Sequence, residues 1–244
     1  MLASCIAVGF LARGISARTV RHIVGWLGTV MLLSEAWRQV VAAFHYNGGD
    51  PYWDYRWDLF PYQFCNMNYY LMPLSALLPD GKLRDRIHCI LATYLVFGGL
   101  SVTIYPVPIF GTNLYVTAQT IMLHVCMVVT GVLLYASGTV KPGVEAVQKA
   151  FPVFFVLTLS AVLLNEVAWL AGLREEFSMF FLSSHYPTIL PILDLMQQLV
   201  PYPVFVFSYM LGYTGLAYGI TYGAKGIMHV CGVLSRRVRA RRIV

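Results

Sequence analysis

The chain has 244 residues, of which 58% are hydrophobic and only 11% are charged, and its net charge is +6. Soluble domains carry about a quarter charged residues, so this composition excludes an ordinary soluble enzyme or binding module and predicts a membrane protein. No long polar stretch divides the chain, which predicts a single transmembrane helical domain over residues 1–244.

The first eleven residues, MLASCIAVGFL, are apolar. They are too few to cross about 30 Å of hydrocarbon as a helix. Because they lack a positively charged segment, they do not resemble a signal peptide. We expect a short or partly inserted first helix here.

Longer apolar segments follow, and each has the length of a transmembrane helix. They are predicted at residues 22–44, 58–79, 87–105, 113–137, 150–172 and 202–230. The expected fold class is therefore all-α, a polytopic bundle of six full spans plus the short N-terminal helix, seven in total.

The charges of the connections alternate along the chain, and this pattern predicts an orientation. The first, third and fifth connections and the C-terminal tail are basic: residues 12–21, 80–86, 138–149 and 232–244. The connections between them are acidic or uncharged. Since cytoplasmic loops are enriched in Lys and Arg, the basic side and the C-terminus are predicted to face the cytoplasm, with the protein in the cell membrane.

Three segments outside the spans are predicted to contact the membrane surface. Residues 173–201 are aromatic and interrupted by prolines, which fits an interfacial or re-entrant segment better than a solvated loop. The Tyr- and Trp-rich stretch 46–57 predicts an aromatic belt on the same, outer side. The tail 232–244 follows a span directly, so we expect it to bind anionic lipid headgroups and not nucleic acid.

The five cysteines show no metal-binding or redox spacing, and their number is odd. They predict neither a disulfide framework nor a zinc site. No glycine-rich phosphate loop and no metalloprotease motif occur in the sequence. No cofactor and no metal are therefore expected.

Four of the predicted spans carry polar residues that are unusual in a membrane. They are Glu35, Arg38, Cys65, Asn66, Asn68, Gln119, His124, Asn165 and Glu166. A helical rise of about 1.5 Å per residue places the members from different spans at a similar depth, in the outer half of the membrane. Scattered structural polar residues need not share one level, so this polar layer is the predicted site.

Each member also has a structural interpretation. Glu35 and Arg38 are three residues apart on one helix face and can neutralise each other. A single cysteine in a membrane helix often packs as a small hydrophobic residue. His124, Asn68 and Asn165 can form hydrogen bonds between helices without any further role.

Cys65 and His124 are the pair whose chemistry matches. A thiolate is a strong nucleophile, and a neighbouring histidine can take up the proton of the thiol. Gln119, Asn66 or Asn68 could donate hydrogen bonds to an oxyanion. Cys65 and His124 are neighbours only if their helices pack face to face, which the sequence does not specify.

Several motifs resemble, in the same order, those of the YwaF-type bacterial integral membrane proteins. Residues 60–65 (FPYQFC) are similar to the LPLxLC motif of that family, and residues 94–100 (YLVFGGL) resemble its fourth span. Further similar elements are the segment from Gln119 to His124, then Asn165, residues 178–182 (SMFFL) and residues 199–203 (LVPYP). The resemblance extends from about residue 18 to about residue 225.

The YwaF-type family is similar in turn to an animal multi-span family described as acyltransferases for ether phospholipids. A membrane cysteine and a histidine are the proposed catalytic pair there, and the matching positions here are Cys65 and His124. The resemblance thus implies an enzyme that acts on fatty acyl groups. This chain has Gln-Phe-Cys-Asn where the animal relative has Asn-Pro-Cys-His, so the histidine beside the cysteine is missing.

Two functions remain open from the sequence. The first is a lipid acyltransferase or acyl hydrolase near the outer leaflet, with a membrane phospholipid or a fatty-acyl substrate. The second is a solute or lipid transporter or binding protein, in which the polar layer, led by Glu35, Arg38 and Glu166, forms an intramembrane cavity. The lack of an inverted repeat disfavours transport, and the lack of a charge close to Cys65 in the sequence disfavours the enzyme.

Overall fold

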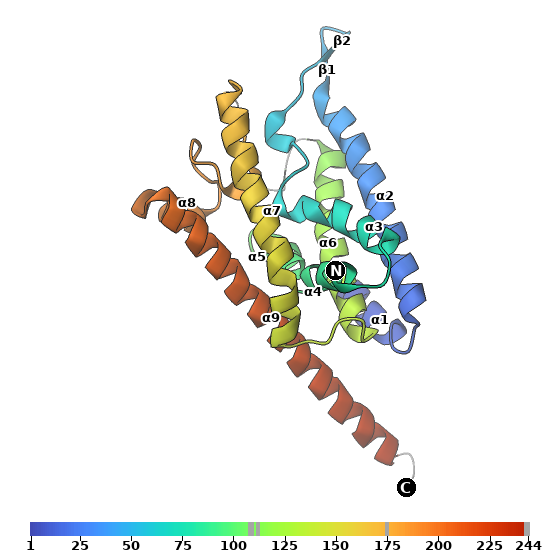
Figure 1. Cartoon of the computed structure of the whole chain (residues 1–244). Coiled ribbons are helices and arrows are strands. Elements are labelled where there is room, and N and C mark those ends of the chain that lie inside the picture. The colour runs from blue at the N-terminus through green and yellow to red at the C-terminus, as the bar shows by residue number, and fades with distance from the viewer. Residues whose placement is uncertain (107–109, 111–112, 174–175, 242–244) are drawn as a thin grey trace.

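The apolar segments form helices that pack side by side, as the computed structural model in Figure 1 shows. The structure describes residues 1–106, 110, 113–173 and 176–241, and for residues 232–241 it describes the backbone alone. The helices are α1 (Leu2–Leu11), α2 (Ala17–Ala43), α3 (Met67–Leu77), α4 (Lys82–Ala92), α5 (Tyr94–Ile104), α6 (Leu114–Ala136), α7 (Val144–Leu170), α8 (Pro191–Leu199) and α9 (Tyr202–Arg241).

Within the described residues, four helical stretches are long and apolar enough to cross a membrane. They are Lys82–Ile104, Leu114–Ala136, Val144–Leu170 and Tyr202–Cys231. The short apolar α1 lies where the sequence predicts a short first helix. α2 has the length of a span, but its polar residues keep it out of this set. The chain is thus an α-helical membrane protein, and the count of six full spans stays a prediction.

The segment predicted as one span at 58–79 is interrupted. Two short 3-10 turns, η1 (Trp57–Leu59) and η2 (Phe64–Asn66), precede α3, which has only 11 residues. A proline disfavours the helical conformation of the residue before it, and Phe60, which precedes Pro61, has φ −51° and ψ 131°. The prediction of an unbroken helix here is therefore wrong, and Cys65 lies at the start of a helix, not inside one.

The stretch 46–57, predicted as an aromatic belt, mostly forms a β-hairpin. The strands β1 (Phe44–Asn47) and β2 (Asp50–Trp53) are antiparallel, and Asn47 pairs with Asp50. Gly48 and Gly49 connect them with φ of 61° and 102°, which glycine adopts without strain. Figure 1 shows that the hairpin extends from the end of the bundle opposite to the C-terminus, here called the hairpin end.

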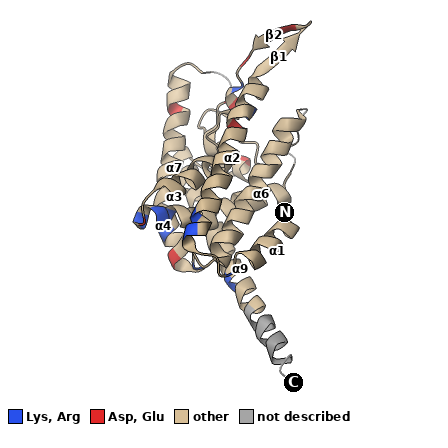
Figure 2. Ribbon diagram, turned by 90° about the vertical axis from the view of Figure 1, so that its right-hand side faces the viewer, with Lys and Arg blue, Asp and Glu red and all other residues tan. Residues whose placement is uncertain are grey.

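Lys and Arg lie mainly toward the end from which α9 leaves the bundle, and acidic residues lie mainly toward the hairpin end (Figure 2). This distribution in space follows the alternation of the connections along the chain. The tail predicted to bind anionic headgroups is residues 232–244. Its side chains lie outside the part of the chain that the structure describes.

Aromatic rings join η2, α5, α7 and α9 beside Cys65, at Phe64, the residue that precedes it. Tyr94 stacks on Phe154 with ring centroids 4.4 Å apart, and Phe64 meets Tyr213 edge-on at 5.1 Å. Such ring pairs add to the free energy gained by burying the rings. The cluster therefore holds Phe64, and with it the backbone at Cys65, at a defined place in the bundle.

A glycine in α5 permits its close approach to α6. A Cβ atom added at Gly99 would lie 2.7 Å from the carbonyl oxygen of His124 and 2.7 Å from Val128 Cγ2. Cβ atoms do not approach a backbone atom that closely, so a side chain at residue 99 would push α5 and α6 apart. Gly99 thereby sets the position of the α6 backbone at His124.

The replacement Gly99→Val is expected to lower the free energy of unfolding by about 1–3 kcal/mol, because the added methyl groups overlap the α6 backbone. Thermal unfolding in detergent, followed by circular dichroism, measures this effect. Gly215→Val is the matched control, since a Cβ atom there meets no heavy atom within 4 Å. Equal melting temperatures of the two variants would contradict the close approach.

Candidate functional site

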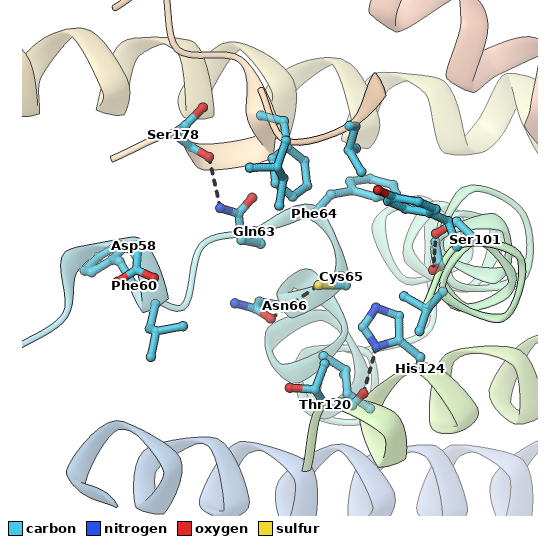
Figure 3. Close-up of a pocket in the computed structure, with 18 of the residues that line it drawn as sticks. Asp58, Phe60, Gln63, Phe64, Cys65, Asn66, Ser101, Thr120, His124 and Ser178 are labelled. Carbon is cyan, nitrogen blue, oxygen red and sulfur yellow. Dashed lines mark hydrogen bonds between the residues drawn. The ribbon is translucent and has the colours of Figure 1, made fainter. Parts of the chain in front are cut away.

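A cavity of about 1170 Å³ lies toward the hairpin end of the bundle, where Phe44, His45 and Arg56 are among its lining residues. It is lined by parts of α2, α5, α6, α8 and α9, by the η1–η2 segment and by residues of the segment 176–193. Five of the nine predicted site residues line it together: Arg38, Cys65, Asn66, Gln119 and His124. Figure 3 shows Cys65, Asn66 and His124 around the same space.

Cys65 occupies the first helical turn after the break at Pro61, with Gln63 as the N-cap of η2. Backbone N–H groups at the start of a helix point outward and can donate hydrogen bonds to a negatively charged atom beside them. The thiol donates a hydrogen bond to Asn66 Oδ1 at 3.5 Å. Sequence analysis finds no charge near Cys65, but Pro61 is the signal that a helix restarts just before it.

His124 lies on α6 and is only 7% exposed. Its Nδ1 is 2.7 Å from the carbonyl oxygen of Thr120. A carbonyl can only accept, so Nδ1 carries the proton and Nε2 is left with a free lone pair. In Figure 3 the second ring nitrogen points away from Thr120, toward the side on which Cys65 lies. Among the described residues no hydrogen bond joins the imidazole to the thiol, and Nε2 is available as a base.

Glu35 and Arg38 form a buried ion pair with two hydrogen bonds of 2.7 Å each. Gln119 Nε2 donates to Glu35 Oε2 at 3.1 Å and to the Tyr69 hydroxyl at 2.6 Å. Because a carboxylate only accepts, the bond to Glu35 fixes which end of the amide is nitrogen.

Both N–H groups of Gln119 are thus engaged. Its Oε1 is buried without a hydrogen-bond partner among the described residues. Gln119 therefore offers an acceptor and not a donor, which does not fit its predicted role toward an oxyanion. Asn66 is different, because its Oδ1 accepts from the thiol and its Nδ2 makes no hydrogen bond within the described structure. Asn66 therefore has a free amide donor at the cavity.

The same network holds the segment that leads to Cys65. Arg38 Nη2 and Gln39 Nε2 donate to the carbonyl oxygen of Leu59 at 3.3 Å and 2.9 Å. The hydroxyl of Tyr55 donates to Gln39 Oε1 at 2.8 Å, and burial raises the pKa of Tyr55, so this hydroxyl keeps its proton. Sequence analysis missed Gln39, whose signal is its position four residues after Glu35 on the same helix face.

Asn165 lies outside the cavity and binds a backbone segment that forms one of its walls. Its amide donates to the Met179 carbonyl at 3.1 Å and accepts from the Met179 N–H at 2.7 Å. From the other side, Gln63 donates to the Ser178 carbonyl at 2.9 Å and accepts from the Phe180 N–H at 3.0 Å. Phe180 and Phe181 both have φ of 58°, a strained conformation for aromatic residues, which these bonds offset.

The structure places Glu166 and Asn68 away from the cavity. Glu166 accepts from the hydroxyl of Ser184 and pairs with His185 Nε2 at 3.0 Å, and His185 stacks on Trp169. Asn68 is only 1% exposed, and its side-chain atoms have no partner among the described residues. Neither residue lines the cavity that holds Cys65 and His124.

Across the described part of the chain, no group of three or more His, Cys, Asp or Glu side chains is arranged to hold a metal ion. Comparisons with the curated proteins and with the solved structures give no match. A family model described as the TMEM164 family matches residues 1–221.

Proposed function

The chain belongs to the TMEM164 family, a family of transmembrane proteins, and from this premise we propose that its cavity is a catalytic site for acyl groups of membrane lipids. The observation that carries this proposal is the arrangement at the cavity. A thiol on the first turn of a helix, Cys65, and an imidazole with a free Nε2, His124, line the same space. The resemblance of the motif order to that of the YwaF-type bacterial proteins, which are similar in turn to ether-phospholipid acyltransferases, supports the same chemistry.

In the first half of the reaction, Cys65 Sγ attacks the carbonyl carbon of a lipid ester, and the thiol proton moves to His124 Nε2. Negative charge then develops on the carbonyl oxygen. The amide N–H of Asn66 and the backbone N–H groups at the start of the helix are the donors available to stabilise it. When the ester C–O bond breaks, the departing lysolipid oxygen takes the proton from His124, and an acyl thioester remains on Cys65.

In the second half, the hydroxyl group of an acceptor lipid gives its proton to His124 Nε2 and attacks the thioester carbonyl. The C–S bond breaks, the sulfur takes the proton from His124, and the acyl group leaves on the acceptor as a new ester. With water as the acceptor, the same steps release a fatty acid. The site thus serves an acyltransferase or an acyl hydrolase, depending on which acceptor reaches it.

The cavity lies on the side that we assign to the outer leaflet of the cell membrane. Lys and Arg gather at the opposite end (Figure 2), and such clusters face the cytoplasm in membrane proteins. The basic tail 232–244 would then lie at the inner surface, where anionic headgroups are its expected partners.

The replacement His124→Ala is expected to slow formation of the thioester by about 10²- to 10⁴-fold, the usual contribution of a general base. Intact-protein mass spectrometry after mixing with phospholipid vesicles measures the acyl adduct, and hydroxylamine removes it if it is a thioester. His22→Ala is the control, because His22 is exposed on α2 and does not line the cavity. Absence of an adduct in the wild type, or equal rates in His124→Ala, would refute the proposal.

A binding or transport role without chemistry is the second candidate. The buried Glu35–Arg38 pair beside the cavity favours it, because ionisable groups inside a membrane often bind solutes. This role requires that ligand uptake is the same in Cys65→Ser as in the wild type, and that no thioester forms.

A further inference from the structure

The cavity has two chemically different parts. Among the described residues, the charged side chains that line it are Arg38, Arg56, Asp58 and Glu176, and they come from α2, from the η1 region and from the segment before η4 (Met179–Phe181). The part between α5, α8 and α9, here called the apolar arm, is lined by Phe97, Ser101, Val102, Leu193, Met196 and Gly212. No charged side chain from these three helices lines it. An amphiphile with one polar end and one apolar end fits such a cavity.

The apolar arm begins beside Cys65. Phe64 meets Tyr213 of α9 at a ring distance of 5.1 Å, and Tyr213 meets Phe97 of α5 at 5.5 Å. From there the cavity follows α5 from Phe97 to the C-cap residue Tyr105, and one face of α9 from residue 208 to 216. Eight helical steps correspond to about 12 Å, so the arm is an elongated space and not a local dent.

The two walls of the arm differ in how much room they leave. On α5, a Cβ atom added at Gly98 would lie 2.9 Å from Met127 Cε of α6, so Gly98 faces that side chain and not open space. On α9, a Cβ atom added at Gly212 would meet no heavy atom within 4 Å. Gly212 lines the cavity, so the space beside it includes the space of the arm. Gly212 is exposed, so a larger side chain there overlaps no protein atom, and because Gly212 lines the cavity such a side chain can reach into the arm.

We propose that the apolar arm between α5 and α9 receives the acyl chain of the substrate and that Gly212 keeps it wide enough for long chains. The inference rests on the proposed function, because it takes Cys65 as the atom that meets the acyl carbonyl. The polar head then lies toward the charged part of the cavity, and the chain lies along α5 and α9. Gly212 is a specificity-determining residue in this arrangement and takes no part in the chemistry.

The test compares Gly212→Leu with Gly215→Leu. A Cβ atom at Gly215 also meets nothing within 4 Å, but Gly215 does not line the cavity. Both replacements put a good helix former in place of a helix-weakening glycine, so both variants are expected to fold. Vesicles carry equal amounts of two phospholipids, one with eight-carbon and one with eighteen-carbon chains, and the ratio of long to short acyl groups transferred is measured.

Gly212→Leu is expected to lower the ratio of long to short chains by about tenfold, the effect of about two methylene groups that no longer find an apolar site. Gly215→Leu is expected to leave the ratio unchanged. An unchanged ratio in Gly212→Leu, or an equal fall in Gly215→Leu, would overturn the inference while the proposed function stands.

A second measurement does not depend on turnover. Each glycine variant is combined with Cys65→Ser, and native mass spectrometry reports which lipids remain bound after extraction from the same vesicles. The expected result is again a loss of long chains in the Gly212→Leu protein alone. If the wild type transfers no acyl group, the proposed function fails, and the ratio of retained lipids still decides for or against the arm.

Discussion

Cys65→Ser is expected to reduce acyl transfer by at least about a thousandfold, the loss typical of removing a catalytic nucleophile. Serine has nearly the same shape and can also donate to Asn66 Oδ1, so the fold and the cavity are expected to persist. A hydroxyl group is far less acidic than a thiol, and His124 is a weak base for it. Transfer of a labelled acyl group between vesicle lipids measures the loss, and lipid retention measures whether binding remains.

Cys126→Ser is the matched control for this experiment. Cys126 lies on α6 two residues after His124, is buried, and does not line the cavity. Its replacement is expected to change the rate of transfer by no more than about twofold, the size of an ordinary substitution away from a site. Near wild-type transfer by Cys65→Ser, or an equal loss in Cys126→Ser, would rule out Cys65 as the nucleophile.

Long apolar segments can be located from the sequence, because in lipid the backbone N–H and C=O groups of a span must form hydrogen bonds to each other within a helix. The run at 113–137 is α6 (Leu114–Ala136) to within a residue at each end. The segment 58–79 has the length of a span, yet it is interrupted at Pro61. Side chains bind the backbone there: Arg38 and Gln39 donate to the carbonyl of Leu59, and the hydroxyl of Tyr70 donates to the carbonyl of Pro61. Composition alone does not predict such a break, because a proline is also tolerated inside or at the ends of membrane spans.

The break at Pro61 also explains why the predicted site residue Asn68 does not line the cavity. Depth along an unbroken helix gives Asn68 the same level as His124, but the helix that contains Asn68 starts only at Met67. Asn68 consequently lies away from the cavity that Cys65 lines. Asn165 shares the level of the others and still makes all its described bonds to Met179, since a level does not specify a helix face.

Cys65 and His124 can be predicted as a pair because a thiol and an imidazole can act together as nucleophile and base. That both line one cavity depends on contacts between helices, which the local sequence does not specify. Gly99 brings α5 against the α6 backbone at His124, and the ring of Phe64 packs on residues from α7 and α9. Gln119 shows the same limit. A glutamine amide can donate or accept a hydrogen bond. The sequence does not show that both N–H groups of Gln119 are used by Glu35 and Tyr69, so that only its carbonyl oxygen is free.

Arg38→Met is expected to lower the free energy of unfolding by about 3–5 kcal/mol, the cost of leaving one member of a buried ion pair without its partner. Glu35 is 2% exposed, so water does not replace the two hydrogen bonds that Arg38 makes to it. Chemical unfolding in detergent measures the loss. Because Arg38 also binds the carbonyl of Leu59, acyl transfer is expected to fall even where the variant is folded.

The double variant Glu35→Leu, Arg38→Met separates the stranded charge from the loss of packing. It is expected to be more stable than Arg38→Met alone, because it no longer buries an unpaired carboxylate, although Gln39 and Gln119 lose an acceptor. Arg56→Met is the control: Arg56 pairs with Asp58 with its side chain 55% exposed, and its loss is expected to cost at most about 1 kcal/mol. A double variant less stable than Arg38→Met would contradict this expectation. It would mean that the amide groups of Gln39 and Gln119 stabilise the Glu35 carboxylate without the arginine. The main role of Arg38 would then be to hold the carbonyl of Leu59, and with it the segment that leads to Cys65.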